Sequence, residues 1–170
     1  MYFDTGARTL PNTTGLSPEK SISSADKYFG FIEGYLQNGG NIGDIRYVTS
    51  RTIRLDSDEI QQLRRSFEDP HYPVGVFCQG DFLASDLLKV CATVGRKVPD
   101  DVSVVGSTGL SIAEHTTPTL SVIPQPMEAM GQAAEEMLLR MIHSGNYRQE
   151  GRYLKSELVF RESFQNSSQP

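Results

Sequence analysis

The side chains that could carry chemistry match no catalytic or metal-binding pattern. His71, His115 and His143 lie in three separate loop or helix-end contexts, with no ligand spacing among them. Cys78 and Cys91 are the only cysteines. Their spacing fits neither a metal site nor a disulfide framework, so we expect both to be buried and reduced. We therefore expect no catalytic residue, no metal and no cofactor, and a protein that is not an enzyme.

Glycine-rich motifs for phosphates or nucleophiles are also missing. No G-x-G-x-x-G follows an expected strand, and neither a P-loop nor a G-x-S-x-G elbow occurs. The run GSTGLS at Gly106–Ser111 follows an apolar segment and could form a phosphate-cradling turn. It lacks the lysine of a P-loop, so it is weak support for phosphate binding.

Composition excludes other classes of protein. A net charge of −5 argues against a broad basic face that grips nucleic acid. The apolar runs are too short for a transmembrane helix. The N-terminal sequence MYFDTGARTL has neither the basic nor the apolar region of a signal peptide, so we expect a cytoplasmic protein.

The positions of strands and helices alternate along most of the chain. Short apolar runs predict strands, and segments with apolar residues at helical spacing predict helices. The predicted strands are Met1–Asp4, Ile45–Thr49, Pro73–Cys78 and Val102–Val105; the predicted helices run from a cap at Ser23 or Ser24 to Asn38-Gly39-Gly40, from Asp56 to Phe67, and from Asp81 to Val94. Such alternation is typical of an α/β fold with an open, doubly wound parallel sheet.

The last third departs from that rhythm. We expect a strand at Leu120–Ile123, a helix from Pro126 to His143, and a closing strand at Glu157–Arg161. Apolar residues recur at helical spacing along the helix, and such a methionine-rich stripe usually belongs to a core or a subunit interface. The stripe consists of Met127, Met130, Ala134, Met137, Leu138 and Met141.

The two ends differ in character from the rest. Residues 1–23 read as a short strand followed by a mobile loop, and residues 165–170 read as a disordered tail.

Polar residues follow the carboxyl ends of the predicted strands, where open α/β sheets bind ligands. These residues are Ser23, Lys27, Gln79, Asp81 and Thr108. Asp81 opens a helix, so capping by its carboxylate competes with direct ligand contact and is the favoured reading. Lys27 lies in the first turn of a helix, where a cation opposes the helix dipole. A positive charge there suits a polar or anionic ligand, and a solvated surface lysine is the alternative.

The stretch PVGVFCQGDFLASDLLKVCATVGRKVPDDVSVVG closely resembles the LacI/GalR family of bacterial transcriptional regulators. The resemblance continues through AEHTTPTLSVIPQPMEAMGQAAEEMLLRMI and the closing ELVFRES. Upstream, Ser24-x-x-Lys27-x-x-Gly30-Phe31 is similar to the family's Ser-x-x-Arg-x-x-Gly-Phe helix. The resemblance covers roughly residues 22–164.

The resemblance implies a periplasmic-binding-protein-like fold with an effector, a sugar by family default, in a cleft between two subdomains. It implies a homodimer that binds DNA through a headpiece and has no membrane contact. Residues 24–164 resemble mainly the C-terminal subdomain, and residues 120–144 resemble the strand and helix that return to the N-terminal one. The headpiece and most of the N-terminal subdomain have no counterpart, so we expect a fragment of a longer effector-binding domain.

Three positions depart from the family pattern. The family's effector-contacting Arg falls on Lys27, its Asn on Gly80, and its sugar-binding Asp on Thr108, whereas Asp81 is retained. The ligand is therefore either a sugar, a different small molecule, or none because the site is vestigial. A solute-binding protein of the same fold is the alternative function.

Overall fold

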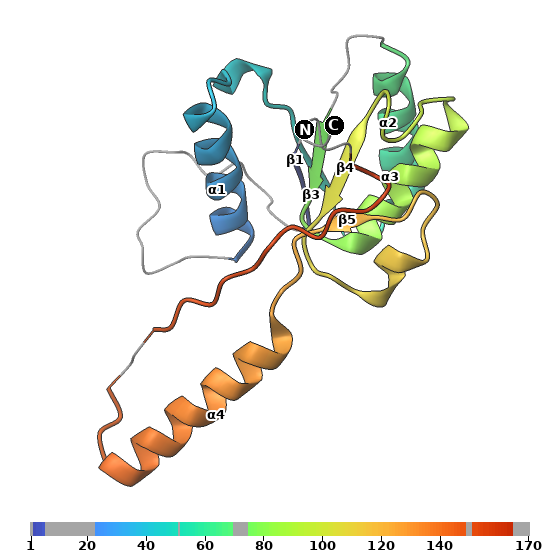
Figure 1. Ribbon diagram of the computed structural model, residues 1–170. Coiled ribbons are helices and arrows are strands. Elements are labelled where there is room, and N and C mark those ends of the chain that lie inside the picture. Colours follow the sequence, from blue (N-terminus) through green and yellow to red (C-terminus); the bar gives the residue numbers. More distant parts are fainter. Residues whose placement is uncertain (1, 6–22, 51, 70–74, 149–150, 165–170) are drawn as a thin grey trace, which may run out of the picture.

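A computed structural model describes residues 2–5, 23–50, 52–69, 75–148 and 151–164. Five parallel strands form one sheet in the order β2-β1-β3-β4-β5 (Figure 1). The strands are β1 (Tyr2–Thr5), β2 (Tyr47–Ser50), β3 (Gly75–Cys78), β4 (Ser103–Gly106) and β5 (Ser121–Val122). The helices are α1 (Ser23–Gln37), α2 (Ser57–Phe67), α3 (Asp81–Thr93) and α4 (Met127–Ser144), with the 3-10 turns η2 (Ile42–Asp44) and η3 (Ser111–Glu114).

Helices cover both faces of the sheet, as the α/β prediction requires. Helix α1 lies on one face, and α2 and α3 lie on the other (Figure 1). The core lies mainly between the sheet and the α2–α3 layer, where Phe67, Leu83, Leu87 and Val104 have at most 1% of their surface exposed. The expected burial of Cys78 and Cys91 is confirmed. The doubly wound architecture is therefore confirmed.

Local sequence explains the start of α2. Asp56 is the N-cap, and its Oδ1 accepts hydrogen bonds from the backbone N–H groups of Asp58 (3.0 Å) and Glu59 (2.9 Å). Glu59 completes a capping box, because its carboxylate accepts the N–H of Asp56 at 3.0 Å. The same carboxylate accepts the hydroxyl of Ser50, the last residue of β2, at 2.8 Å. The cap thus also joins the helix to the strand before it.

The expected strand over Glu157–Arg161 is wrong except at one residue. Val159 forms an isolated antiparallel bridge with Val122 in β5. Side chains make the neighbouring links instead: the Ser121 hydroxyl donates to the Arg161 carbonyl and accepts the Arg161 N–H. Ser163, which is fully buried, donates its hydroxyl to the Val104 carbonyl at 2.6 Å and accepts the Ser121 N–H at 2.8 Å. These hydrogen bonds hold the segment against β4 and β5.

Helix α4 extends away from the sheet (Figure 1). Its end matches the sequence prediction, because Gly145 follows it in the left-handed conformation with φ of 61°. Ala133 is the buried residue of the helix. Most of the large apolar side chains are exposed, so the stripe belongs to no core within the described residues. About half of the surface is exposed in each of five residues: Met127, Met130, Leu138, Leu139 and Ile142.

Within the described residues, no helix is long and apolar enough to cross a bilayer. The loop predicted over residues 6–22 and the tail over 165–170 lie outside the described residues.

Replacing Asp56 by Ala should lower the free energy of unfolding by about 1 kcal/mol, because two N–H groups at the start of α2 lose their acceptor. Urea denaturation followed by circular dichroism would measure it. Asp58→Ala is the control, since Asp58 is in the same turn but is not the cap. Equal losses in both variants would contradict the capping role.

Candidate ligand site at the carboxyl edge of the sheet

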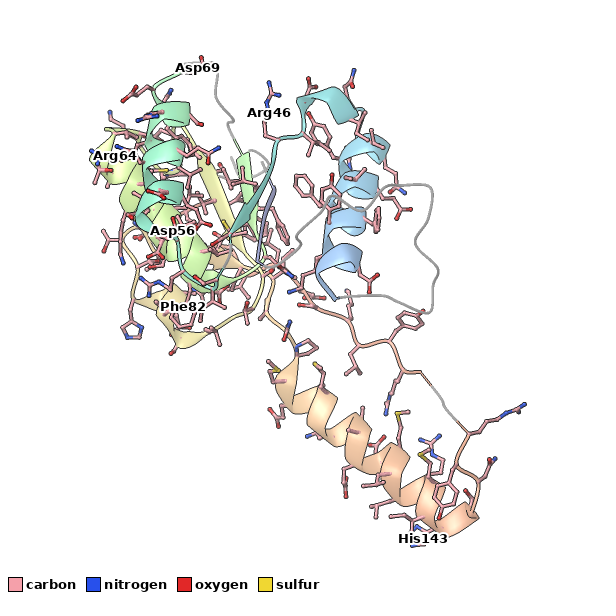
Figure 2. All side chains as sticks on the ribbon, turned by 180° about the vertical axis from the view of Figure 1, so that it is seen from behind. Arg46, Asp56, Arg64, Asp69, Phe82 and His143 are labelled. Atoms are coloured by element: carbon pink, nitrogen blue, oxygen red, sulfur yellow. The ribbon has the colours of Figure 1, made fainter. Side chains whose placement is uncertain are left out.

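The parallel strands end at one edge of the sheet, and several polar groups gather there. Helices α1 and α3 begin at this edge, and the chain leaves it toward α4 (Figure 1). Asp56 and Phe82 lie toward the same end in Figure 2, whereas Asp69 lies at the opposite one. We call the segment Gly106–Leu110 the ligand loop; it starts at Gly106, the last residue of β4, and continues at this edge.

Lys27 reaches the ends of two strands from the first turns of α1. Its ammonium donates to the carbonyls of Gln79 (3.5 Å) and Ser107 (3.3 Å) and to the Ser107 hydroxyl (3.4 Å). The Ser107 hydroxyl donates in turn to the Gln79 carbonyl. Because strong N–H···O bonds are about 2.7–3.2 Å long, these contacts hold the ammonium loosely. The structure thus brings together Lys27 and Gln79 from the predicted set.

Asp81 does not cap α3, so that expectation is wrong. Gly80 occupies the N-cap position, and no side-chain hydrogen bond caps the helix. The Asp81 carboxylate instead accepts the N–H groups of Thr108 (3.1 Å) and Leu110 (2.6 Å) in the ligand loop. Asp81 has none of its surface exposed, so its carboxylate holds the loop from the interior of the protein. Direct contact between Asp81 and a ligand remains a prediction.

Thr108 lies beside Gly80, and its side chain is half-buried. A Cβ built on Gly80 would lie 3.9 Å from the Thr108 hydroxyl oxygen, an ordinary van der Waals distance. Ser23 is the first residue of α1, and its side chain lies outside the described part of the structure. The ligand roles predicted for Thr108 and Ser23 likewise stay predictions.

Ser107 is a site residue that the sequence reasoning missed. It is 4% exposed and joins Lys27 to Gln79. The signal in the sequence that could have pointed to Ser107 is the pair of nearby glycines, Gly106 and Gly109. A Cβ on Gly106 would lie 2.5 Å from Asp81 Oδ1. Gly109 has φ of +79°, and a Cβ there would lie 2.8 Å from Pro124 Cα. Both glycines are therefore required by close packing around the ligand loop.

The histidines do not join this site. His115 directly follows η3, and His143 lies at the far end of α4 (Figure 2). His71 lies outside the described residues. In the part of the chain that the structure describes, no three His, Cys, Asp or Glu side chains form a metal-binding group.

Surface hollows occur away from the strand ends. One of about 550 Å³ runs along α2, and another of about 220 Å³ lies at the end of α4. The hollow along α2 is open and lined by polar side chains such as Asp58, Gln62 and Arg65, with no group from the sheet. Ligand pockets are typically concave and largely apolar, so the hollow along α2 does not resemble one.

Comparisons with known proteins identify the fold and the family. Residues 29–164 match the family described as a periplasmic binding protein-like domain. The chain belongs to this family. It is a domain of the LacI type, because its relatives with related sequence and structure include LacI-family regulators.

Two relatives by sequence are each an HTH-type transcriptional repressor PurR. The one from Shigella sonnei is 33% identical in an alignment of 136 positions that covers 71% of this chain and 40% of that protein. The one from Escherichia coli O139:H28 is 38% identical over 80 residues, which are 47% of this chain and 24% of that protein. The chain thus spans well under half the length of these relatives.

Solved structures share the fold over nearly the whole chain. The transcriptional regulator CelR–cellobiose complex matches with a TM-score of 0.71 and 25% identity, over 95% of this chain and 46% of that one. A LacI family transcriptional regulator from Arthrobacter sp. FB24 in complex with lactose matches with a TM-score of 0.70 and 24% identity, over 96% of this chain and 57% of that one.

A cluster of charged side chains in this periplasmic binding protein-like domain joins the loop after β2 to α3. Arg54, in the loop after β2, forms a two-pronged ion pair with Asp86 of α3 at 2.8 and 2.6 Å. Asp86 also accepts the Leu55 N–H at 3.2 Å. Burial opposes its ionisation, but these hydrogen bonds and the charges of Arg54 and Lys89 outweigh burial and lower the Asp86 pKa. The cluster fixes the β2–α2 loop against α3.

Asp86→Asn should destabilise the fold by about 1–3 kcal/mol near neutral pH, because it removes a charged hydrogen-bond acceptor. Since the folded-state pKa of Asp86 is lowered, its contribution is present above the ordinary pKa of about 3.9 and is lost as pH falls through the folded-state pKa. The difference in unfolding free energy between wild type and variant should therefore narrow as the pH falls below that ordinary value.

Denaturant titrations across this pH range would measure that difference. Glu157→Gln serves as the matched control, because its ion pair with Lys155 joins two exposed side chains and should matter little. If the difference in unfolding free energy between wild type and Asp86→Asn stayed constant with pH, ionisation of Asp86 would not be the source of the stabilisation.

Proposed function

We propose that the chain is the effector-sensing and dimerising module of a LacI-type bacterial transcriptional regulator. In this proposal a small polar ligand, with a sugar as the first candidate, binds at the carboxyl edge of the sheet. Binding biases the arrangement of subdomains and thereby controls DNA binding by a headpiece elsewhere in the regulator. The ligand acts by preferring one of two pre-existing arrangements, and the module itself carries out no chemistry.

The observation that carries the proposal is the convergence on the ends of β3 and β4. Lys27 from α1 meets the carbonyls of Gln79 and Ser107, and Asp81 from α3 holds the ligand loop beside them. Hydrogen-bond donors and acceptors from different elements thus meet at the place where α/β sheets bind ligands. An ammonium, a serine hydroxyl and a threonine hydroxyl suit hydroxyl-rich or anionic small molecules.

Structures with the same fold favour a sugar as the first class to test. Beyond the cellobiose and lactose complexes, a LacI family regulator from Enterococcus faecium was solved with bound ribose, with a TM-score of 0.70. A sugar-binding transcriptional regulator from Escherichia coli was solved with phosphate, with a TM-score of 0.69. At 20 and 21% identity these two share only the fold with this chain, so they guide the choice of probes and no more.

Lys27→Ala should weaken ligand binding at least about tenfold while changing the free energy of unfolding by less than about 1 kcal/mol, because the hydrogen bonds of its ammonium to Gln79 and Ser107 are long. The ligand is first found by thermal shift with cellobiose, lactose, ribose, sugar phosphates, nucleosides and inorganic phosphate. A ligand at one hundred times its Kd should raise the melting temperature by about 5–10 °C. Calorimetry then gives the affinity of each variant.

Lys89→Ala is the matched control. Lys89 is also a helix lysine, but it lies on α3, pairs with Asp86 and has 67% of its side chain exposed. It should leave the affinity unchanged. Unchanged affinity in Lys27→Ala would remove Lys27 from the site, and the absence of a shift with every probe would count against effector sensing.

Self-association through α4 is the second part of the proposal. The exposed apolar side chains of this helix form a surface of the kind that mediates protein contacts. A second copy of the chain is the proposed occupant, since a twofold pair presents the same helix from both sides. The resemblance to dimeric regulators favours the same arrangement.

Leu138→Glu should convert a dimer to a monomer in sedimentation velocity, because Leu138 is 59% exposed in the single chain and a carboxylate would be buried in the pair. Glu135→Gln, an exposed change on the same helix, should leave the dimer intact. A wild-type chain that sediments as a monomer while the α4 amides resist hydrogen exchange would contradict this arrangement.

A further inference from the structure

We propose that Asp81 is a positioning residue that couples the ligand loop to the linker into α4. The linker is Ile123–Pro126, between β5 and α4. The inference rests on the proposed function only in taking Gly106–Leu110 as the loop that a ligand would contact. Its structural content, a chain of contacts from α3 to α4, is tested without any ligand.

The first contact joins α3 to the ligand loop. Both oxygens of the Asp81 carboxylate are used, one for the Thr108 N–H at 3.1 Å and the other for the Leu110 N–H at 2.6 Å. Hydrogen bonds from backbone N–H to a carboxylate are stronger than those between neutral groups. Asp81 has no exposed surface, so its carboxylate has no water to bind and depends on these two N–H groups for its hydrogen bonds. The carboxylate therefore holds Thr108 and Leu110 in their places in the loop.

Close packing adds a further contact between the start of the loop and the same side chain. A Cβ added to Gly106 would be 2.5 Å from Asp81 Oδ1 and 3.0 Å from Leu120 Cδ2. The backbone at Gly106 thus lies directly against Asp81, so a shift of Asp81 would displace the loop.

The second contact joins the ligand loop to the linker. The Ile123 N–H donates to the Gly106 carbonyl at 3.0 Å, and the Gln125 N–H donates to the Thr108 carbonyl at 3.0 Å. Thr108 thus donates to Asp81 through its N–H and accepts from the linker through its carbonyl, so one peptide segment serves both contacts. Gly109 packs directly on Pro124, between these two hydrogen bonds.

The linker is in turn hydrogen-bonded to the first residue of α4. The carbonyl of Gln125 accepts the N–H of Met127, the first residue of α4, at 2.8 Å. Ser156 on the returning segment donates its hydroxyl to the Pro124 carbonyl, so both crossings of the chain are held at the same point. A ligand that moves the loop would therefore change the start of α4, and Asp81 sets the resting position of both.

Amide hydrogen exchange measured by NMR on the ligand-free chain tests the coupling. Asp81→Asn keeps the size of the side chain but turns an NH₂ group toward one of the two N–H donors. Exchange should become at least tenfold faster at Thr108 and Leu110, and also at Ile123 and Gln125, which do not touch Asp81. The Leu55 amide should not change.

Asp86→Asn is the matched control on the same helix. Asp86 is also a buried aspartate that accepts a backbone N–H, but from Leu55. This variant should speed exchange at Leu55 and leave the ligand loop and the linker unchanged. The two variants thus predict opposite patterns, which a general loss of stability would not produce.

Gly109→Ala tests the second contact independently and serves if Asp81→Asn does not fold. An alanine there is strained at φ of +79° and meets Pro124. It should speed exchange at Ile123 and Gln125 by at least tenfold. Faster exchange confined to Thr108 and Leu110 in Asp81→Asn, a uniform rise across the chain, or no change at Gln125 in Gly109→Ala would overturn the coupling. Failure of every ligand probe would leave this result standing.

Discussion

The carboxylate of Asp81, sealed from water and shared between two backbone N–H groups, is the interaction on which the rest of this edge depends. An unsatisfied buried carboxylate or N–H costs more free energy than a typical hydrogen bond contributes, so the loop and the aspartate must stay together. The loop places Ser107 under Lys27 and carries the backbone that anchors the linker to α4. Site and outgoing helix are therefore built on one polar contact.

The sequence was most informative where local rules decide the structure. The capping box at Asp56 and Glu59 and the left-handed Gly145 depend on neighbours within a few residues, so α2 and the end of α4 match their predictions. The closing strand failed for the opposite reason. Its apolar residues do not reveal that the hydroxyls of Ser121 and Ser163, 42 positions apart, make several of the hydrogen bonds that join this segment to the sheet.

The contrast between local rules and long-range contacts also explains which site residues could be predicted. Lys27 and Gln79 could be placed from the sequence because strand ends and helix starts of a parallel sheet share an edge. The role of Asp81 could not, because an aspartate at the start of a helix is usually explained by capping, and its actual partners are 27 and 29 residues away. Ser107 follows the same strand end but was left out of the predicted set, because nothing in its own residue type shows that it joins Lys27 to Gln79.

The three glycines at this edge are present for different reasons. Gly106 and Gly109 are demanded by packing, since a Cβ at either would collide with Asp81 or Pro124. Gly80 is not, because its backbone is extended, with φ of −145°, and a Cβ would meet Thr108 at an ordinary distance. The fold would accept a side chain there, such as the asparagine of the family pattern. Of the three glycines, Gly80 is therefore the one that the packing of this edge does not require.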